Sequence, residues 1–133
     1  FLEIARECGI SGAAIHQRVK KMEESGVIRG FRLEVDPTAL GYNVSAMIGI
    51  RINDPSMNFE IVDGLRRIPE VVECHFVTGK YNIWTRVYCV DHEHLMHTIL
   101  DHILRVPGVS ETETLISLSD SFGRQVSVRD LDQ

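Results

Sequence analysis

The sequence predicts an α+β protein in which a small helical unit precedes an antiparallel sheet covered by two helices. Residues 1–32 show apolar residues at helical spacing, interrupted by a glycine, and from Val44 onward the order strand, helix, strand occurs twice. The longest apolar runs are strand-sized, well short of the roughly 18 residues that span a bilayer. At 133 residues the chain has room for one ordinary domain or two small ones.

Composition and charge favour a folded protein with a basic end. Apolar residues make up 44% of the chain and charged residues 25%, close to the globular average. The net charge is −5, but residues 1–32 carry six Lys and Arg against four Glu, and residues 33–133 carry eight against fifteen. A basic N-terminal unit can meet phosphate while the acidic remainder keeps the protein soluble.

The ends and the cysteines bear on cellular location. The chain opens on Phe1 in what reads as the middle of a helix, without an initiator Met or a signal pattern. We therefore expect that the true N-terminus of the protein lies before Phe1. Cys8, Cys74 and Cys89 show neither a C-x-x-C spacing nor a metal-ligand spacing, which favours reduced, buried cysteines in a cytoplasmic protein with no membrane contact.

The basic end is predicted to form two helices joined by a tight turn. A first helix ends at Gly9, where a left-handed residue costs glycine little, and Ser11 stands where a helix N-cap belongs. The second helix closes at Gly26. Its core-facing residues recur at helical spacing and are Ala14, Ile15, Val19 and Met22. Two helices joined by a short turn containing Gly have helix-turn-helix geometry.

The outward face of the second helix is the candidate DNA-binding surface. Small residues in its first turn permit close approach to a groove, His16 and Gln17 can bond base edges, and basic residues can reach phosphates. The predicted DNA-binding residues are Ser11, Gly12, Ala13, His16, Gln17, Arg18, Lys20 and Lys21. The alternative is a solvated surface helix with a few basic side chains.

Residues 27–35 alternate like a strand and are predicted to form a wing or hinge that ends at Asp36-Pro37. We therefore expect a helix-turn-helix domain with a hinge strand over 1–36, a linker over 37–43 and a second domain over 44–133.

The acidic part contains an internal repeat. Predicted strands cover 44–52, 71–78, 83–90 and 109–118, with helices between the first and second and between the third and fourth. Arg67-Ile68-Pro69-Glu70-Val71 matches Arg105-Val106-Pro107-Gly108-Val109 at the two helix-to-strand junctions. This is the ferredoxin-like βαββαβ order, with both helices on one face of the sheet.

The other face of that sheet is predicted to be apolar and to mediate dimerisation. Its expected residues are Met47, Val71, Val77, Trp84, Tyr88, Ile116 and Leu118. The alternating tail, residues 124–129, is a candidate edge strand.

Four stretches together resemble the Lrp/AsnC family, the leucine-responsive or feast/famine regulators. These are residues 4–11, 18–31, 37–42 and 73–82. The resemblance implies a winged helix-turn-helix that binds double-stranded DNA, and an amino-acid-sensing domain in homodimers that assemble into tetramers or octamers. It also implies an additional first helix before this chain.

The resemblance further implies an effector site near the turn after the second strand and at the fourth strand. Carried over, its residues are Gly79, Lys80, Tyr81, Asn82, Thr112 and Thr114. The family's turn usually ends in aspartate, whereas this chain has Asn82, so an ammonium group would lose a charge-assisted hydrogen bond there.

The sequence also leaves other functions open. A histidine-rich segment could suggest a metal or a pH sensor, but it has no HExxH pattern and solvation explains it; its residues are His92, His94, His97, Asp101 and His102. No nucleophile elbow, phosphate loop or paired carboxylate predicts an enzyme, and no cofactor or metal is expected. The remaining alternatives are a tetrapyrrole-modifying enzyme resembling the sirohaem decarboxylases, and a sensor module that does not bind DNA.

Overall fold

The computed structural model describes residues 1–130. They divide after Glu34 into two compact units, unit 1 from Phe1 to Glu34 and unit 2 from Val35 onward. The first domain was predicted to end at residue 36, two residues after the observed boundary at Glu34. Within the described residues, no helix is both long enough and apolar enough to cross a membrane. The two units are described separately below.

Unit 1 contains α1 (Leu2–Cys8) and α2 (Gly12–Glu24), and its local chemistry follows the sequence. Gly9 ends α1 with φ 68° in the left-handed region. The Oγ of Ser11 accepts a hydrogen bond from the Ala14 backbone N–H at 3.1 Å and so caps α2. Both the turn glycine and the cap serine are confirmed.

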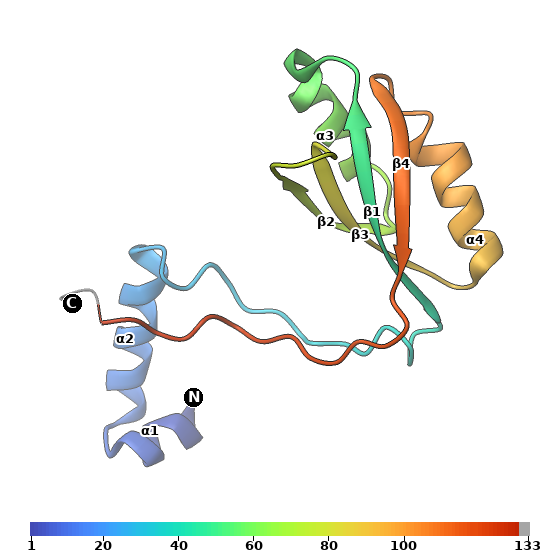
Figure 1. The fold of residues 1–133 in the computed structure, drawn as a ribbon. Helices are drawn as coiled ribbons and strands as arrows, with labels where there is room; N and C mark the ends of the chain where they lie inside the picture. The colour runs from blue at the N-terminus through green and yellow to red at the C-terminus, as the bar shows by residue number, and fades with distance from the viewer. Residues whose placement is uncertain (131–133) are drawn as a thin grey trace. The chain divides into compact units, whose positions relative to one another are not determined.

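The packing of unit 1 differs from the prediction at one end of α2. Ala5 and Ile15 are buried between the two helices, while Met22 is 38% exposed although it was predicted to face the core. Figure 1 shows α1 beside the first turns of α2 only. Met22 lies in the last turns, beyond the part of α2 that α1 covers.

Two predicted strands are wrong. Neither 27–35 nor 124–129 is a strand in the described chain. Their apolar residues do not pack against the sheet but are strongly exposed, Leu33 at 91% and Val128 at 100%. Alternation indicates an extended backbone with one apolar side, but a strand also needs a neighbour to pair with its N–H and C=O groups.

Unit 2 is built on a four-stranded antiparallel sheet in the order β2-β3-β1-β4. The strands are β1 (Val44–Ile52), β2 (Val71–Phe76), β3 (Ile83–Cys89) and β4 (Val109–Ile116). This order confirms the predicted βαββαβ arrangement. The first strand has the predicted bounds, and the other three end one or two residues earlier than predicted.

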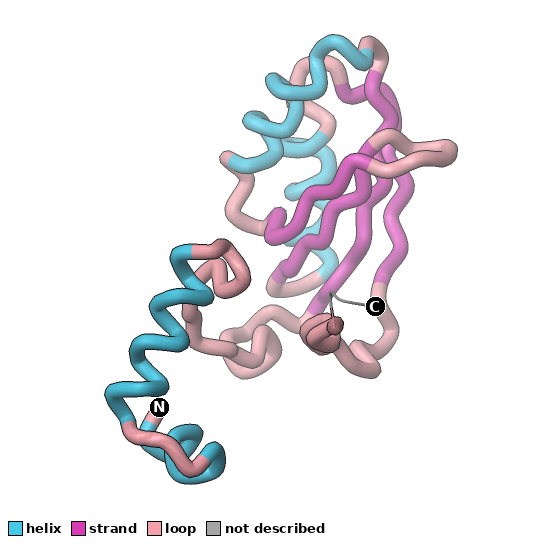
Figure 2. The backbone as a smooth tube through the Cα atoms, turned by 90° about the vertical axis from the view of Figure 1, so that its left-hand side faces the viewer, coloured by secondary structure: helices cyan, strands magenta, loops and turns pink. Residues whose placement is uncertain are grey.

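The helical segments all lie on one face of this sheet (Figures 1 and 2). A short 3₁₀ helix, Pro55–Met57, leads into α3 (Asn58–Arg66), and α4 (His92–His97) continues as a π-helix, Thr98–Ile103. The Oδ1 atoms of Asp54 and Asp91 accept backbone N–H bonds at 3.0 and 2.8 Å and cap the first turns. The π-helix was not predicted.

The core lies between this helical layer and the sheet. Its largest fully buried apolar side chains are Ile48, Ile50, Ile61, Leu65, Ile83, Val87, Cys89 and Ile103. Gly64 allows a close approach, because a Cβ there would lie 2.8 Å from Cγ1 of Val106. The expectation of buried cysteines holds for Cys89, whereas Cys8 and Cys74 are exposed.

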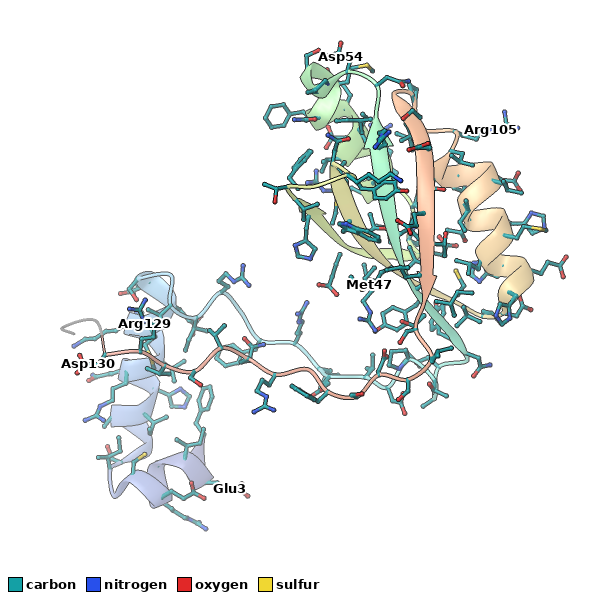
Figure 3. The ribbon with its side chains drawn as sticks, in the orientation of Figure 1. Glu3, Met47, Asp54, Arg105, Arg129 and Asp130 are labelled. Carbon is teal, nitrogen blue, oxygen red and sulfur yellow. The ribbon has the colours of Figure 1, made fainter. Side chains whose placement is uncertain are left out.

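The sheet face away from the helices is called the open face below. Met47, Trp84 and Tyr88 lie on it as predicted, because they alternate with buried residues of β1 and β3. Val71 instead packs against the core, and Ile116 pairs with Ala46 on the helix side. The open-face residue of β4 is Leu115, which pairs with Met47. Figure 3 shows Met47 and Asp54 toward opposite ends of β1.

Candidate functional site

The predicted DNA-binding residues all lie on the first three turns of α2 or at its cap. Most are exposed: Ala13, His16, Gln17, Arg18, Lys20 and Lys21. Ser11 is engaged as the N-cap, and Gly12 is half-buried, because a Cβ there would meet Leu2 Cδ2 at 3.5 Å. The His16 ring contacts the ring of Phe1 edge-on, with centroids 5.3 Å apart.

This surface has the chemistry that duplex DNA requires. Amide and imidazole groups on one helix can bond base edges in the major groove, and the flanking guanidinium and ammonium groups can neutralise phosphates. Three basic side chains are exposed on α2, the helix that Ser11 caps: Arg18, Lys20 and Lys21. The helix-turn-helix prediction therefore has a matching surface in unit 1.

The turn from Gly79 to Asn82 is fixed by backbone geometry and by one side chain. Gly79 has φ 112°, in the region that favours glycine. The Asn82 Oδ1 accepts a hydrogen bond from the Ile52 backbone N–H at 3.0 Å, and the Asn82 N–H donates to the Ile50 carbonyl at 3.0 Å. Asn82 thus ties the turn to β1, so its side-chain oxygen already has a partner within the chain.

Tyr81 folds back over the open face. Its ring packs edge-on against Trp84, with centroids 5.7 Å apart, and both rings lie over Gly49. A Cβ on Gly49 would come within 2.9 Å of the Trp84 ring and 3.0 Å of Tyr81 Cγ. The absence of a side chain at Gly49 therefore makes room for Tyr81, which is only 9% exposed.

Charges of both signs surround this ring. Arg51 pairs with Glu111 at 3.2 Å and donates to the Lys80 carbonyl at 3.2 Å, while the Lys80 Nζ lies 5.7 Å from the Tyr81 ring centroid. Burial, followed by the nearby Glu113 carboxylate, raises the pKa of Tyr81. Sequence reasoning missed Arg51, Glu111 and Glu113. The register of β1 against β4 would have identified them, because it pairs Arg51 with Glu111 and Gly49 with Glu113.

Thr112 and Thr114 do not join this cluster within one chain. They pair with Ile50 and Ile48, whose side chains face the helices, so the two threonines lie on the opposite face from Tyr81. Both are half-buried. The structure brings Gly79, Lys80, Tyr81 and Asn82 together with Arg51 and the β4 carboxylates instead.

The histidine-rich segment is occupied by internal hydrogen bonds. His94 Nε2 lies 3.0 Å from Glu70 Oε1, and its Nδ1 accepts from the Val90 backbone N–H at 2.9 Å. His97 Nδ1 lies 2.8 Å from Asp101 Oδ2, a contact that raises the pKa of His97. Over residues 1–130, no group of three or more His, Cys, Asp and Glu side chains is placed to hold a metal ion.

The Glu70 contact predicts an acid-dependent loss of stability. The hydrogen bond from His94 lowers the pKa of Glu70 below its ordinary 4.5. A carboxyl whose pKa is lower when folded stabilises the protein above its unfolded pKa, and this contribution disappears as pH falls through the folded value. We expect Glu70→Gln to lower the unfolding midpoint at pH 6, and the difference from the original chain to shrink as the pH falls below 4.5 and through the lowered pKa of folded Glu70. Urea denaturation followed across this range measures it; a difference that is constant with pH would contradict the assignment.

Comparisons with known proteins match both units. Residues 1–29 match a winged helix-turn-helix DNA-binding family, and residues 45–126 match the Lrp/AsnC ligand binding domain. Regulatory protein AsnC of Escherichia coli strain K12 is 34% identical over 126 residues, covering 95% of this chain and 83% of the relative. The transcriptional regulator FL11 of Pyrococcus horikoshii is 36% identical over 116 residues, covering 87% of this chain and 76% of the relative.

Solved structures agree with this assignment. The structure of E. coli AsnC superposes with a TM-score of 0.86 at 34% identity, covering 94% of this chain and 84% of that one. A feast or famine regulatory protein from M. tuberculosis, complexed with L-methionine, has a TM-score of 0.86 at 28% identity, covering 97% and 87%. The relatives are regulators rather than enzymes. The chain therefore belongs to the Lrp/AsnC family of transcription regulators and carries its helix-turn-helix DNA-binding and ligand-binding domains.

Proposed function

We propose that this protein regulates transcription by placing the exposed face of α2 in the major groove of specific DNA sites. The observation that carries the proposal is the row of polar and basic side chains, Gln17, Lys20 and Lys21, on a capped helix within a region that matches a DNA-binding family. Arg18 and His16 extend the same surface. Ser11, Gly12 and Ala13 are the small residues that allow the helix to approach the groove.

The protein acts as a homodimer or a larger homo-oligomer in this proposal. The open face supports it, because Met47, Tyr88 and Leu115 leave apolar surface on the sheet without helices over it. A dimer would carry two copies of α2, which could enter successive major grooves about one helical turn apart, roughly 34–36 Å.

The effector is proposed to be an amino acid or related metabolite bound at the turn Gly79–Asn82, with Thr112 and Thr114 contributed at a contact between copies. The guanidinium of Arg51 and the ammonium of Lys80 suit a carboxylate, and Glu111 and Glu113 suit an ammonium. A zwitterion matches charges of both signs. That a relative at 28% identity is complexed with L-methionine supports the same ligand class.

DNA binding is tested by fluorescence anisotropy with promoter DNA over a series of salt concentrations. We expect Lys20→Ala to weaken binding to all sequences and to reduce the slope of log K against log salt by about 1, because one phosphate contact is lost. Gln17→Ala should change the preferred bases while leaving that slope unchanged. Glu60→Ala, at an exposed position of α3, is the control with unchanged binding. Binding that does not respond to salt would contradict direct DNA recognition.

Effector binding is tested by thermal shift with the twenty amino acids and common keto acids. A ligand at 100 times its dissociation constant adds about 2.7 kcal/mol to the stability of the folded form, so a true effector raises the midpoint. We expect Lys80→Ala to reduce that rise and to leave DNA affinity without ligand unchanged. Lys20→Ala should do the reverse. A midpoint rise that Lys80→Ala leaves intact would place the ligand elsewhere.

A further inference from the structure

A cavity lies in unit 2, at the other end of β3 from the Gly79–Asn82 turn. Its volume is about 310 Å³, within the roughly 300–1,000 Å³ range of small-molecule pockets. The segment before β1 supplies one wall, and the start of β2, the end of β3 and the start of α4 supply the others. Five of its lining side chains bear on ligand binding: Leu40, Tyr42, Glu70, Val72 and His94.

The polar part of this cavity is a carboxylate beside an imidazole. His94 Nδ1 accepts the Val90 backbone N–H, so the ring proton resides on Nε2 and is donated to Glu70 Oε1 at 3.0 Å. That same hydrogen bond lowers the pKa of Glu70. Glu70 is therefore ionised near neutral pH, and a carboxylate holding one donor has acceptor capacity for others.

Among the described residues that line the cavity there is no Lys or Arg. Arg86 lies near, with its guanidinium 5.3 Å from the Tyr88 ring centroid, but it does not line the cavity. Its guanidinium donates to Asp120 at 2.8 Å and to Ser45 Oγ at 3.1 Å, so the Asp120 carboxylate balances its charge. The cavity thus presents an apolar wall with one negative group in it.

We propose that this cavity is a binding site, separate from the effector turn, for a small organic ammonium with an apolar body. The ammonium would donate to the Glu70 carboxylate, and the apolar body would pack against Leu40, Val72 and the Tyr42 ring. A ligand there would contact the segment that leads back toward unit 1. The site does not depend on the amino-acid effector.

Isothermal titration of the full chain with two probes tests the charge preference. The probes are phenethylamine and hydrocinnamate, which share a ring and a similar chain length but carry opposite charges. We expect the amine to bind at least about ten-fold more tightly than the acid, as expected when a charge-assisted hydrogen bond is gained. Glu70→Gln should weaken amine binding about ten-fold or more and leave acid binding no weaker, while its amide oxygen can still accept from His94. Equal affinity for the two probes, no heat with millimolar amine, or an amine affinity that Glu70→Gln leaves unchanged would overturn the proposal.

Two further variants locate the site. Val72→Trp fills the cavity from a half-exposed position and should abolish amine binding, with the circular dichroism spectrum unchanged. If Glu70→Gln does not fold, Val72→Trp still tests whether the amine binds in this cavity. Lys80→Ala, at the other end of the sheet, should leave the amine affinity unchanged. Retained binding in Val72→Trp, or lost binding in Lys80→Ala, would place the amine outside this cavity and refute the assignment.

Discussion

Ile48→Ala is expected to lower the free energy of unfolding by about 2–5 kcal/mol. Ile48 is fully buried in the middle of β1, the strand between β3 and β4, and belongs to the core under the helices. Its backbone carbonyl also accepts the buried Thr85 hydroxyl at 3.1 Å. The substitution removes three carbons and leaves a cavity in the core. The strands on either side, β3 and β4, cannot move in to fill it, because their hydrogen bonds to β1 fix their positions.

Urea denaturation at one fixed protein concentration measures this loss, since assembly makes stability depend on concentration. Leu100→Ala is the matched control: it removes the same number of carbons from a π-helix residue that is 50% exposed, and should cost about 0.5 kcal/mol or less. Equal losses in the two variants would mean that Ile48 does not belong to a tightly packed core.

The fold of unit 2 could be predicted because its determinants are local or repeated. The alternation from Val44 to Ile52 fixes both the bounds of β1 and its buried face, and this face is the one observed. Pro69 and Pro107 end the two helical regions at equivalent places and reveal the repeat. The helix cap at Ser11 and the helix end at Gly9 are also determined by nearby residues, so both predictions were confirmed.

The errors arose where structure depends on a partner strand or on register. Along β4, one face carries Glu111, Glu113 and Leu115 and the other carries Thr112, Thr114 and Ile116, and neither face is clearly more apolar. Only the pairing with β1 decides which face meets the helices. In β2, an irregularity between Val71 and Glu73 changes the alternation, so Val71 faces the core.

The candidate site shows the same division between local and non-local information. The outward face of α2 and the turn at Gly79 follow from short stretches of sequence, so their residues could be named in advance. Arg51 and Glu111 are 60 positions apart in the chain and meet only because β1 and β4 pair in a particular register. The packing of Tyr81 over Gly49 also depends on that fold, since a single glycine in a strand does not say which ring will cover it.

Met47→Lys is expected to raise the dissociation constant of the proposed dimer by at least about 100-fold, equivalent to about 2.7 kcal/mol. Met47 lies on the open face, pairs in register with Arg86 on β3 and Leu115 on β4, and is 42% exposed in the single chain. A charge introduced there must be desolvated when two open faces meet. Twofold symmetry introduces the substitution twice.

Sedimentation velocity over a dilution series measures the dissociation, and anisotropy with promoter DNA measures its consequence. Two linked copies of α2 bind DNA with an effective concentration that a single copy lacks, so the variant should also lose DNA affinity at concentrations where it is monomeric. Leu100→Lys places the same charge at a comparable exposure on the helical side and should leave both measurements unchanged. If Met47→Lys instead remains dimeric and binds DNA normally, copies of this chain associate through a surface other than the open face, and the two α2 helices must be spaced on DNA by that other contact.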